Sequence, residues 1–329
     1  MRYGKCLLLL LPIILTPLLL TLAVKAEGKP IVVVYAKGML EMNPQLKEMI
    51  SGIPEVEWKV ITKKEDFTFD AIKDAKMLIV VLVDAAAGIT DEECAVIKKW
   101  FDQGGKTLWV CGDSDYKGGD YKRIGPINKI LETVGSCLRS EHTEGCDAKS
   151  NCGKSYRVAA LIKPDRGVKF LAEGVTKPVL FHGPGIVIAY VNGKYIGLEK
   201  KRPKNVYRIA WTSEGGVVSE FVPPVGEVHK PGYKGPLVLM AAEVFPEKKN
   251  IVILSAEAPF DHYRGMWITS YHGVALDGPT FVRNVVLWGV GLKGKIPAGI
   301  AIPILYIVII IVIIIIIVAV VLAVRRRKK

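Results

Sequence analysis

The clearest hydrophobic pattern in the chain consists of two uninterrupted apolar runs, at Ile31–Ala36 and Met77–Val83. A strand that is buried on both faces has no polar side, as in parallel sheets, so both runs are predicted to be buried parallel strands. Shorter strands are predicted at Trp58–Ile61 and Lys106–Cys111. Together they predict the core of one sheet.

Helical patterns alternate with these strands. One helix is expected near Pro44–Ser51, and the next begins at a capping box in which Thr90 is the N-cap and Glu93 lies three residues later. A further helix carries three apolar residues on one face, Ile124, Ile127 and Leu131. This alternation predicts an α/β fold with three layers, in which helices cover both faces of a parallel sheet.

From about Cys137 the pattern changes to short β-rich runs separated by turns. Asn192-Gly193, between two alternating segments, is typical of a β-hairpin. We interpret residues 137–235 as a β-rich, mostly antiparallel insertion that divides the α/β domain into a first part, 27–136, and a closing part, 236–292. In the closing part, strands at Leu237–Val244 and Asn250–Ser255 are expected to return to the main sheet, and the last helix is expected to start at Asp277-Gly278-Pro279.

Both ends of the chain indicate a membrane. Residues 1–26 combine basic residues, an apolar stretch and a small-residue exit, as in a secretory signal peptide, with an uncleaved anchor as the alternative. Residues 296–324 carry no charge and exceed the roughly 20 residues that cross a bilayer as a helix. The basic tail 325–329 is expected to stay cytoplasmic. The sequence therefore predicts a single-pass protein of the cell membrane whose main domain is extracellular.

The net charge supports this interpretation. The chain has a formal charge of +13, but residues 1–26 and 325–329 contribute eight basic residues and no acidic ones, which leaves +5 for the rest. A nucleic-acid partner needs basic residues clustered on the folded domain, so the high net charge does not indicate one.

The segment from Met77 to Gly135 resembles the class I glutamine amidotransferase-like fold, in its non-catalytic branch. The residues that carry the resemblance are the strand Met77–Val83, Ile89–Glu93, Gly104–Leu108 and Ile127–Leu131, with Phe281–Trp288 similar to the closing helix. That branch includes domains of gliding-motility and intraflagellar-transport proteins and many membrane-anchored archaeal proteins. The resemblance implies a binding or scaffold role without a cofactor.

Catalytic members of that fold place a nucleophilic cysteine close to the position of Cys111. As a thiolate it would need a histidine, for which His262 and His272 are the candidates. The Cys-x-Gly-x-Gln pattern of the catalytic members is absent, because Gly112 follows Cys111 directly, and no His-x-Glu occurs late in the chain. A cysteine-dependent hydrolase or transferase is therefore the alternative to a binding domain.

An extracellular compartment favours disulfide bonds. Cys94 and Cys111 are expected at the same edge of the sheet, within bridging distance. Two of Cys137, Cys146 and Cys152 are candidates for closing a small loop. These three cysteines and His142 lack the C-x₂₋₄-C spacing of zinc sites, so no metal is expected.

Two polar segments are candidate ligand-binding residues. Asp113, Ser114, Asp115 and Tyr116 follow a strand at the carboxyl edge of the sheet, where ligands bind in open α/β sheets, although the same residues also simply form turns. The segment 257–272 mixes aromatic, basic and acidic side chains, and its candidates are Asp261, His262, Tyr263, Arg264 and Trp267. A packed loop is the alternative there, and His182–Gly185 and His229 are interpreted as turns of the insertion.

These features together predict a non-enzymatic extracytoplasmic binding or scaffold domain. Its expected partner is an envelope protein, a transporter or a saccharide. A surface-layer or adhesion component is the second alternative, and it predicts self-association.

Overall fold

The computed structural model describes residues 28–84, 86, 88–116, 120–219, 221, 223, 226–260, 264–297 and 312–317. The predicted signal peptide, 1–26, lies outside this part of the chain, and the predicted span 296–324 is described only at 296–297 and 312–317. None of the helices in the described ranges is both long and apolar enough to cross a bilayer.

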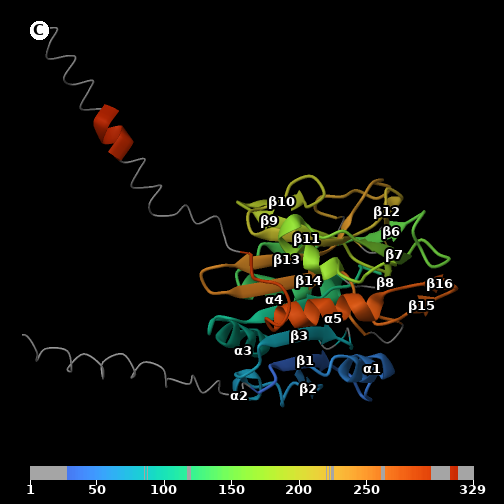
Figure 1. Cartoon of the computed structure of the whole chain (residues 1–329). Helices are drawn as coiled ribbons and strands as arrows, with labels where there is room; N and C mark the ends of the chain where they lie inside the picture. The colour runs from blue at the N-terminus through green and yellow to red at the C-terminus, as the bar shows by residue number, and fades with distance from the viewer. Residues whose placement is uncertain are drawn as a thin grey trace, which may run out of the picture.

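A nine-stranded sheet forms the centre of the molecule, in the order β2-β1-β3-β4-β14-β13-β11-β7-β8 (Figure 1). The first five strands are parallel: β2 (Glu57–Ile61), β1 (Ile31–Lys37), β3 (Met77–Leu82), β4 (Thr107–Cys111) and β14 (Asn250–Ser255). The other four are antiparallel: β13 (Val238–Phe245), β11 (Val206–Trp211), β7 (Arg157–Ile162) and β8 (Val179–His182). The predicted parallel sheet is therefore present, and the segment predicted to be antiparallel supplies β7, β8 and β11, but these strands extend the main sheet instead of forming a separate insertion.

The change of direction has a local cause. The turn between β13 and β14 is only four residues long, from Pro246 to Lys249, and a connection of that length can join only antiparallel neighbours. β11, β7 and β8 then extend the sheet beyond β13. Much of the β-rich segment thus continues the main sheet.

Helices cover both faces of the parallel half. α1 (Pro44–Gly52) and α5 (Gly278–Gly289) pack together on one face with the 3₁₀ turn η3 (Arg166–Ala172). The other face carries α2 (Phe69–Ile72), α3 (Asp91–Phe101) and α4 (Gly125–Thr133), the last preceded by a π-helical turn, η2 (Asp120–Ile124). Figure 1 shows α5 lying across the sheet. The three predicted layers are therefore present.

Local signals placed several elements correctly. β1 and β3 are almost fully buried, as uninterrupted apolar runs require. At the start of α3, the Thr90 hydroxyl accepts from the Glu93 amide at 3.3 Å while the Glu93 carboxylate accepts from the Thr90 amide at 2.8 Å, which is the predicted capping box. Asn192 and Gly193 have φ values of 52° and 77° and form the predicted hairpin turn.

Three smaller sheets complete the fold. β5 (Leu138–Ser140), β9 (Val187–Val191) and β10 (Lys194–Gly197) form one, and β6 (Glu144–Asp147) pairs with β12 (Gly216–Ser219). β15 (Ser270–Tyr271) and β16 (Val274–Ala275) form the last. The first two hold segments of the insertion, which approach the loop after β4 where Gly185 lies against Asp113.

The two edges of the parallel sheet have different neighbours. We call the edge where β1, β3, β4 and β14 end the carboxyl edge, and the edge where they begin the amino edge. The chain enters β1 at the amino edge, and α5 ends there too, because the Thr107 hydroxyl at the start of β4 donates to the Gly289 carbonyl at 2.7 Å (Figure 1). The predicted membrane segments therefore join the domain on the same side.

Candidate functional site

The segment after β4 is the first part of a candidate site at the carboxyl edge. Ser114 and Asp115 are buried, whereas the Tyr116 side chain is 51% exposed. The Asp113 carboxylate is held by the Arg123 guanidinium at 2.5 Å, and Arg123 also donates to the Leu82 carbonyl at 3.2 Å. Arg123 thus ties the end of β3 to the loop after β4 and fixes the backbone that carries Tyr116.

Glu144 of β6 joins this segment from the insertion. It is 4% exposed, and its pKa is raised to about 7, mainly by burial. The hydrogen bond from the Cys146 thiol lowers the pKa, whereas the negative charges of Asp115 and Asp113 raise it. The carboxyl group therefore changes its protonation state near neutral pH. The sequence gives no sign of this position, because Glu144 lies in the insertion and is brought near Asp113 and Asp115 by tertiary packing.

Two exposed aromatic rings lie beside these acids. Tyr116 and Phe221 form an edge-to-face pair with centroids 5.3 Å apart, and Phe221 is 54% exposed. Phe221 follows β12, whose Ser219 is paired with Glu144, so the two rings come from segments that the sheets bring together. Exposed aromatic faces suit a ligand that offers an apolar face or a positive charge, and the buried acids behind them add negative potential.

The described part of the segment 257–272 is mainly structural. Glu257 is buried, and its carboxylate accepts from the amides of His182 and Ala258, both at 2.7 Å. Trp267 is 7% exposed, and its ring lies so close to Gly52 of α1 that an added Cβ there would meet it at 2.5 Å. Arg264 is exposed, while Asp261, His262 and Tyr263 lie outside the described residues. Trp267 is therefore buried against α1, where it packs on Gly52.

Cys111 has the properties of a structural thiol. It is 4% exposed, and burial raises its pKa well above the ordinary value. A hydrogen bond with Ser255 lowers the pKa and the charge of Glu257 raises it, but burial is the largest influence. His272 lies in the exposed turn between β15 and β16, where its ring packs on Tyr271 at 4.3 Å. A nucleophilic cysteine needs a lowered pKa, so these surroundings oppose the role.

The predicted disulfides are absent from the described structure, in which all five cysteines are free: Cys94, Cys111, Cys137, Cys146 and Cys152. The reason is the direction of their side chains. The Cys94 thiol forms a hydrogen bond with Thr133 of α4, whereas the Cys111 thiol forms one with Ser255 of β14. Cys137 lies beside Glu243, Cys146 beside Glu144, and Cys152 in a separate apolar cluster. Sharing an edge of the sheet did not bring the thiols together.

Two histidines, one buried and one partly buried, have partners that the sequence did not indicate. His229, interpreted as part of a turn, is 1% exposed and lies between two carboxylates, with Nδ1 at 2.5 Å from Glu141 and Nε2 at 3.2 Å from Glu199. His142, considered with the three clustered cysteines, is instead 2.5 Å from Glu227. Neighbouring residues Glu141 and His142 thus hold the segment around 227–229 in place.

Comparison with known proteins supports one part of the resemblance. A family model described as the IFT52 GIFT domain matches residues 31–143. This segment is similar to an intraflagellar-transport domain. It contains β1 to β5 with their helices and includes Asp113 to Tyr116, but it stops just before Glu144. The resemblance to intraflagellar-transport domains is therefore supported for the segment that contains four of the five parallel strands, β1 to β4.

The other comparisons add little. No curated protein matches the chain. Among solved structures, a putative ThuA-like protein from Bacteroides uniformis aligns with 82% of this chain and 95% of its own, at 9% identity and a TM-score of 0.43.

Proposed function

We propose that this chain is a membrane-anchored, non-enzymatic binding domain that recognises a saccharide or protein partner at its carboxyl edge. The observation that carries the proposal is the exposed Tyr116–Phe221 pair beside the buried acids Asp115 and Glu144. Solvent-exposed aromatic rings at fixed positions are characteristic of recognition surfaces. The match to the GIFT domain favours a binding or scaffold role over catalysis.

The geometry of the edges supports this arrangement. Both chain ends meet the domain at the amino edge, so an anchor at residues 296–324 leaves the carboxyl edge facing away from the bilayer. Leu40, 99% exposed in the turn after β1, adds an apolar contact at that outward edge. A partner in the cell envelope would meet this surface first.

Site-specific photo-cross-linking in living cells tests the proposal. A photoreactive amino acid replaces Tyr116 in one variant and Tyr190 in the control, because Tyr190 forms a second exposed aromatic pair with Tyr195 on β9 and β10. We expect an adduct from position 116 alone, and its loss when Phe221→Ala is added. Adducts of equal yield from both positions, or none from 116, would contradict the proposal.

The composition of the adduct distinguishes the partner classes. A product that is shortened by glycosidases indicates a saccharide, and one that is shortened by proteases and contains a foreign chain indicates an envelope protein. A product that contains two copies of this chain would favour the surface-layer or adhesion alternative instead.

A further inference from the structure

Lysines precede most of the strands that start at the amino edge. Lys76 comes directly before β3, Lys106 before β4 and Lys249 before β14, while Lys29 and Lys204 lie two residues before β1 and β11. Met77, Thr107 and Ile251 are paired with one another across β3, β4 and β14, so they lie at the same level of the sheet. Val244 of β13 is paired with Ile251, and its amide donates a hydrogen bond to the Asn205 carbonyl, which places the start of β11 at this level too. Neighbouring strands are about 4.8 Å apart, so these lysines form a row along the edge. We call them the lysine row.

Most of the lysine row is available to a partner outside the chain. Lys106 is buried, with its amine donating to the carbonyls of Lys73 and Ala75, but the other four are exposed. Within the described residues none of these four forms an ion pair. Lys201 and Lys295 are exposed basic side chains as well, whereas the neighbouring Arg202 is engaged within the domain by Asp165 at 3.6 Å.

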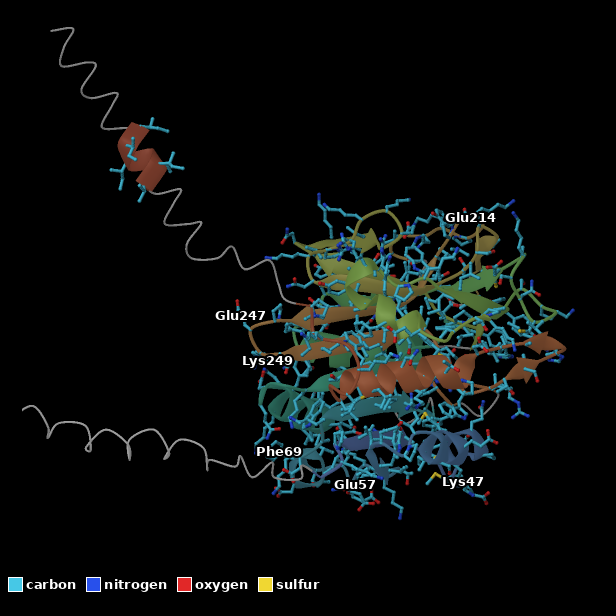
Figure 2. The ribbon with its side chains drawn as sticks, in the orientation of Figure 1. Lys47, Glu57, Phe69, Glu214, Glu247 and Lys249 are labelled. Carbon is cyan, nitrogen blue, oxygen red and sulfur yellow. The ribbon has the colours of Figure 1, made fainter. Side chains whose placement is uncertain are left out.

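Acids at the same edge are mostly neutralised by other cations. Asp102 is paired with Lys98 at 2.6 Å and Lys248 at 3.0 Å, and Glu55 is paired with Arg283. Asp165 is held by Arg208 at 2.9 Å. Asp74, Glu247 and Glu57 remain exposed there, the last of them 3.9 Å from Lys59. The four exposed lysines of the row still leave the edge with an excess of positive charge, and Lys249, Glu247 and Glu57 mark it in Figure 2.

The exit of the chain places this edge close to any bilayer that holds residues 296–324. After α5 the chain folds back, because the amides of Leu292 and Lys293 both donate to the Leu287 carbonyl. Gly294 still packs on the domain, since an added Cβ would meet the Phe170 ring at 2.4 Å. Only Lys295 separates this contact from Ile296, where the apolar run begins. At about 3.5 Å per residue, the amino edge stays within roughly 10 Å of the start of that run.

From the lysine row and this short connection we infer that the amino edge is a docking surface for the anionic headgroups of membrane phospholipids. The inference rests on the membrane anchor proposed above. Clusters of lysine and arginine close to a membrane segment bind anionic lipid surfaces, and the attraction falls off within a Debye length of about 10 Å. Docking would hold the carboxyl edge, with Tyr116 and Phe221, at a constant distance and orientation above the bilayer.

Lysine footprinting of the full chain in lipid nanodiscs tests this inference. The chain is reconstituted in phosphatidylglycerol or in phosphatidylcholine, acetylated briefly, and the modification of each lysine is measured by mass spectrometry. We expect Lys204 and Lys249 to be modified several-fold more slowly in phosphatidylglycerol, and this difference to vanish in 0.5 M salt. Lys47, exposed on α1 at the other end of the molecule (Figure 2), should be modified equally in both lipids.

A charge-reversal variant provides the matched comparison. In K201E/K204E/K249E we expect Lys29 and Lys76 to lose their protection from acetylation in phosphatidylglycerol. The control K47E/K149E/K154E reverses three exposed lysines from outside the amino edge and should keep that protection. Equal modification of the row in the two lipids would overturn the inference alone. A chain recovered outside the nanodiscs would overturn the anchor and the inference with it.

Discussion

A buried carboxylate in this domain stays charged where several hydrogen-bond donors surround it, and Glu93 is the clearest example. Its carboxylate accepts from the Lys37 amine and the Thr90 amide, both at 2.8 Å, and from the Tyr35 hydroxyl. Burial opposes the charge, but the hydrogen bonds from Lys37 and Tyr35 outweigh it and lower the pKa of Glu93. The capping box was visible in the sequence, whereas the partners on β1 were not.

Glu93→Gln should destabilise the domain strongly. Lys37 is 6% exposed and would be left buried without a counter-ion, which costs about 3 kcal/mol by comparison with other broken buried ion pairs. Chemical denaturation followed by tryptophan fluorescence measures the change in the free energy of unfolding. Glu92→Gln is the control, because that side chain is 78% exposed and should change stability by less than about 0.5 kcal/mol. Equal effects of the two substitutions would show that the buried pair is unimportant.

The thiol of Cys111 should be unreactive in the folded chain. Burial raises its pKa, so almost no thiolate is present at neutral pH. Alkylation with iodoacetamide at pH 8, followed by mass spectrometry, should modify Cys111 only after denaturation. Rapid modification of the native chain would instead restore the hydrolase or transferase alternative.

At the scale of elements, buried ion pairs hold distant segments of the insertion to one another. Glu141, just after β5, accepts from the amides of Val228 and His229 at 2.6 and 2.7 Å as well as from the His229 ring. Burial lowers the pKa of His229, but the hydrogen bonds and charges of Glu141 and Glu199 dominate and raise it to about 9. The imidazole is therefore positively charged in the folded protein at neutral pH.

This triad predicts a pH-dependent stability. The pKa of His229 in the folded protein is above its ordinary value of 6.5, so the charged imidazole stabilises the fold. Its contribution to the free energy of unfolding is complete below pH 6.5 and is lost as the pH rises through about 9. The loss should be on the order of a few kcal/mol and should appear as faster hydrogen exchange around residues 226–235 once the intrinsic pH dependence is removed. His229→Gln should abolish this dependence and destabilise the segment at pH 6. An unchanged pH profile in that variant would contradict the prediction.

At the scale of the whole molecule, the two edges of the sheet have opposite surroundings. The carboxyl edge carries buried acids and exposed aromatic rings, and the amino edge carries the lysine row and both connections to the predicted membrane segments. This polarity follows from parallel strands, because a parallel sheet places all strand starts on one side and all strand ends on the other.

Truncation tests the anchor directly. A chain that ends at Lys295 should leave the membrane fraction on alkaline carbonate washing if residues 1–26 are removed as a signal peptide, whereas a chain that lacks only 325–329 should stay. The apolar run supplies the affinity for the bilayer, and the basic tail mainly fixes the orientation. Release of the full chain by carbonate would refute the anchor.

The sequence by itself determined the elements whose signals are local. Long apolar runs define β1 and β3, the Thr90–Glu93 capping box defines the start of α3, and Asn192-Gly193 defines a hairpin turn. Each of these depends on residues within a few positions of one another, so no knowledge of distant contacts is needed. The position of Asp113 to Tyr116 after a strand was predictable for the same reason.

Only the tertiary structure decided which distant residues meet. The antiparallel half of the sheet, the contact of Glu144 and Phe221 with the β4 loop, the burial of His229 and the separation of the five thiols all depend on pairings between segments far apart in the chain. Successive side chains along a strand point to opposite faces of the sheet, so the surroundings of each one are set by the register and order of the strands rather than by its residue type. The sequence therefore placed the edge at which a site was expected, and the packing of the insertion decided which residues form it.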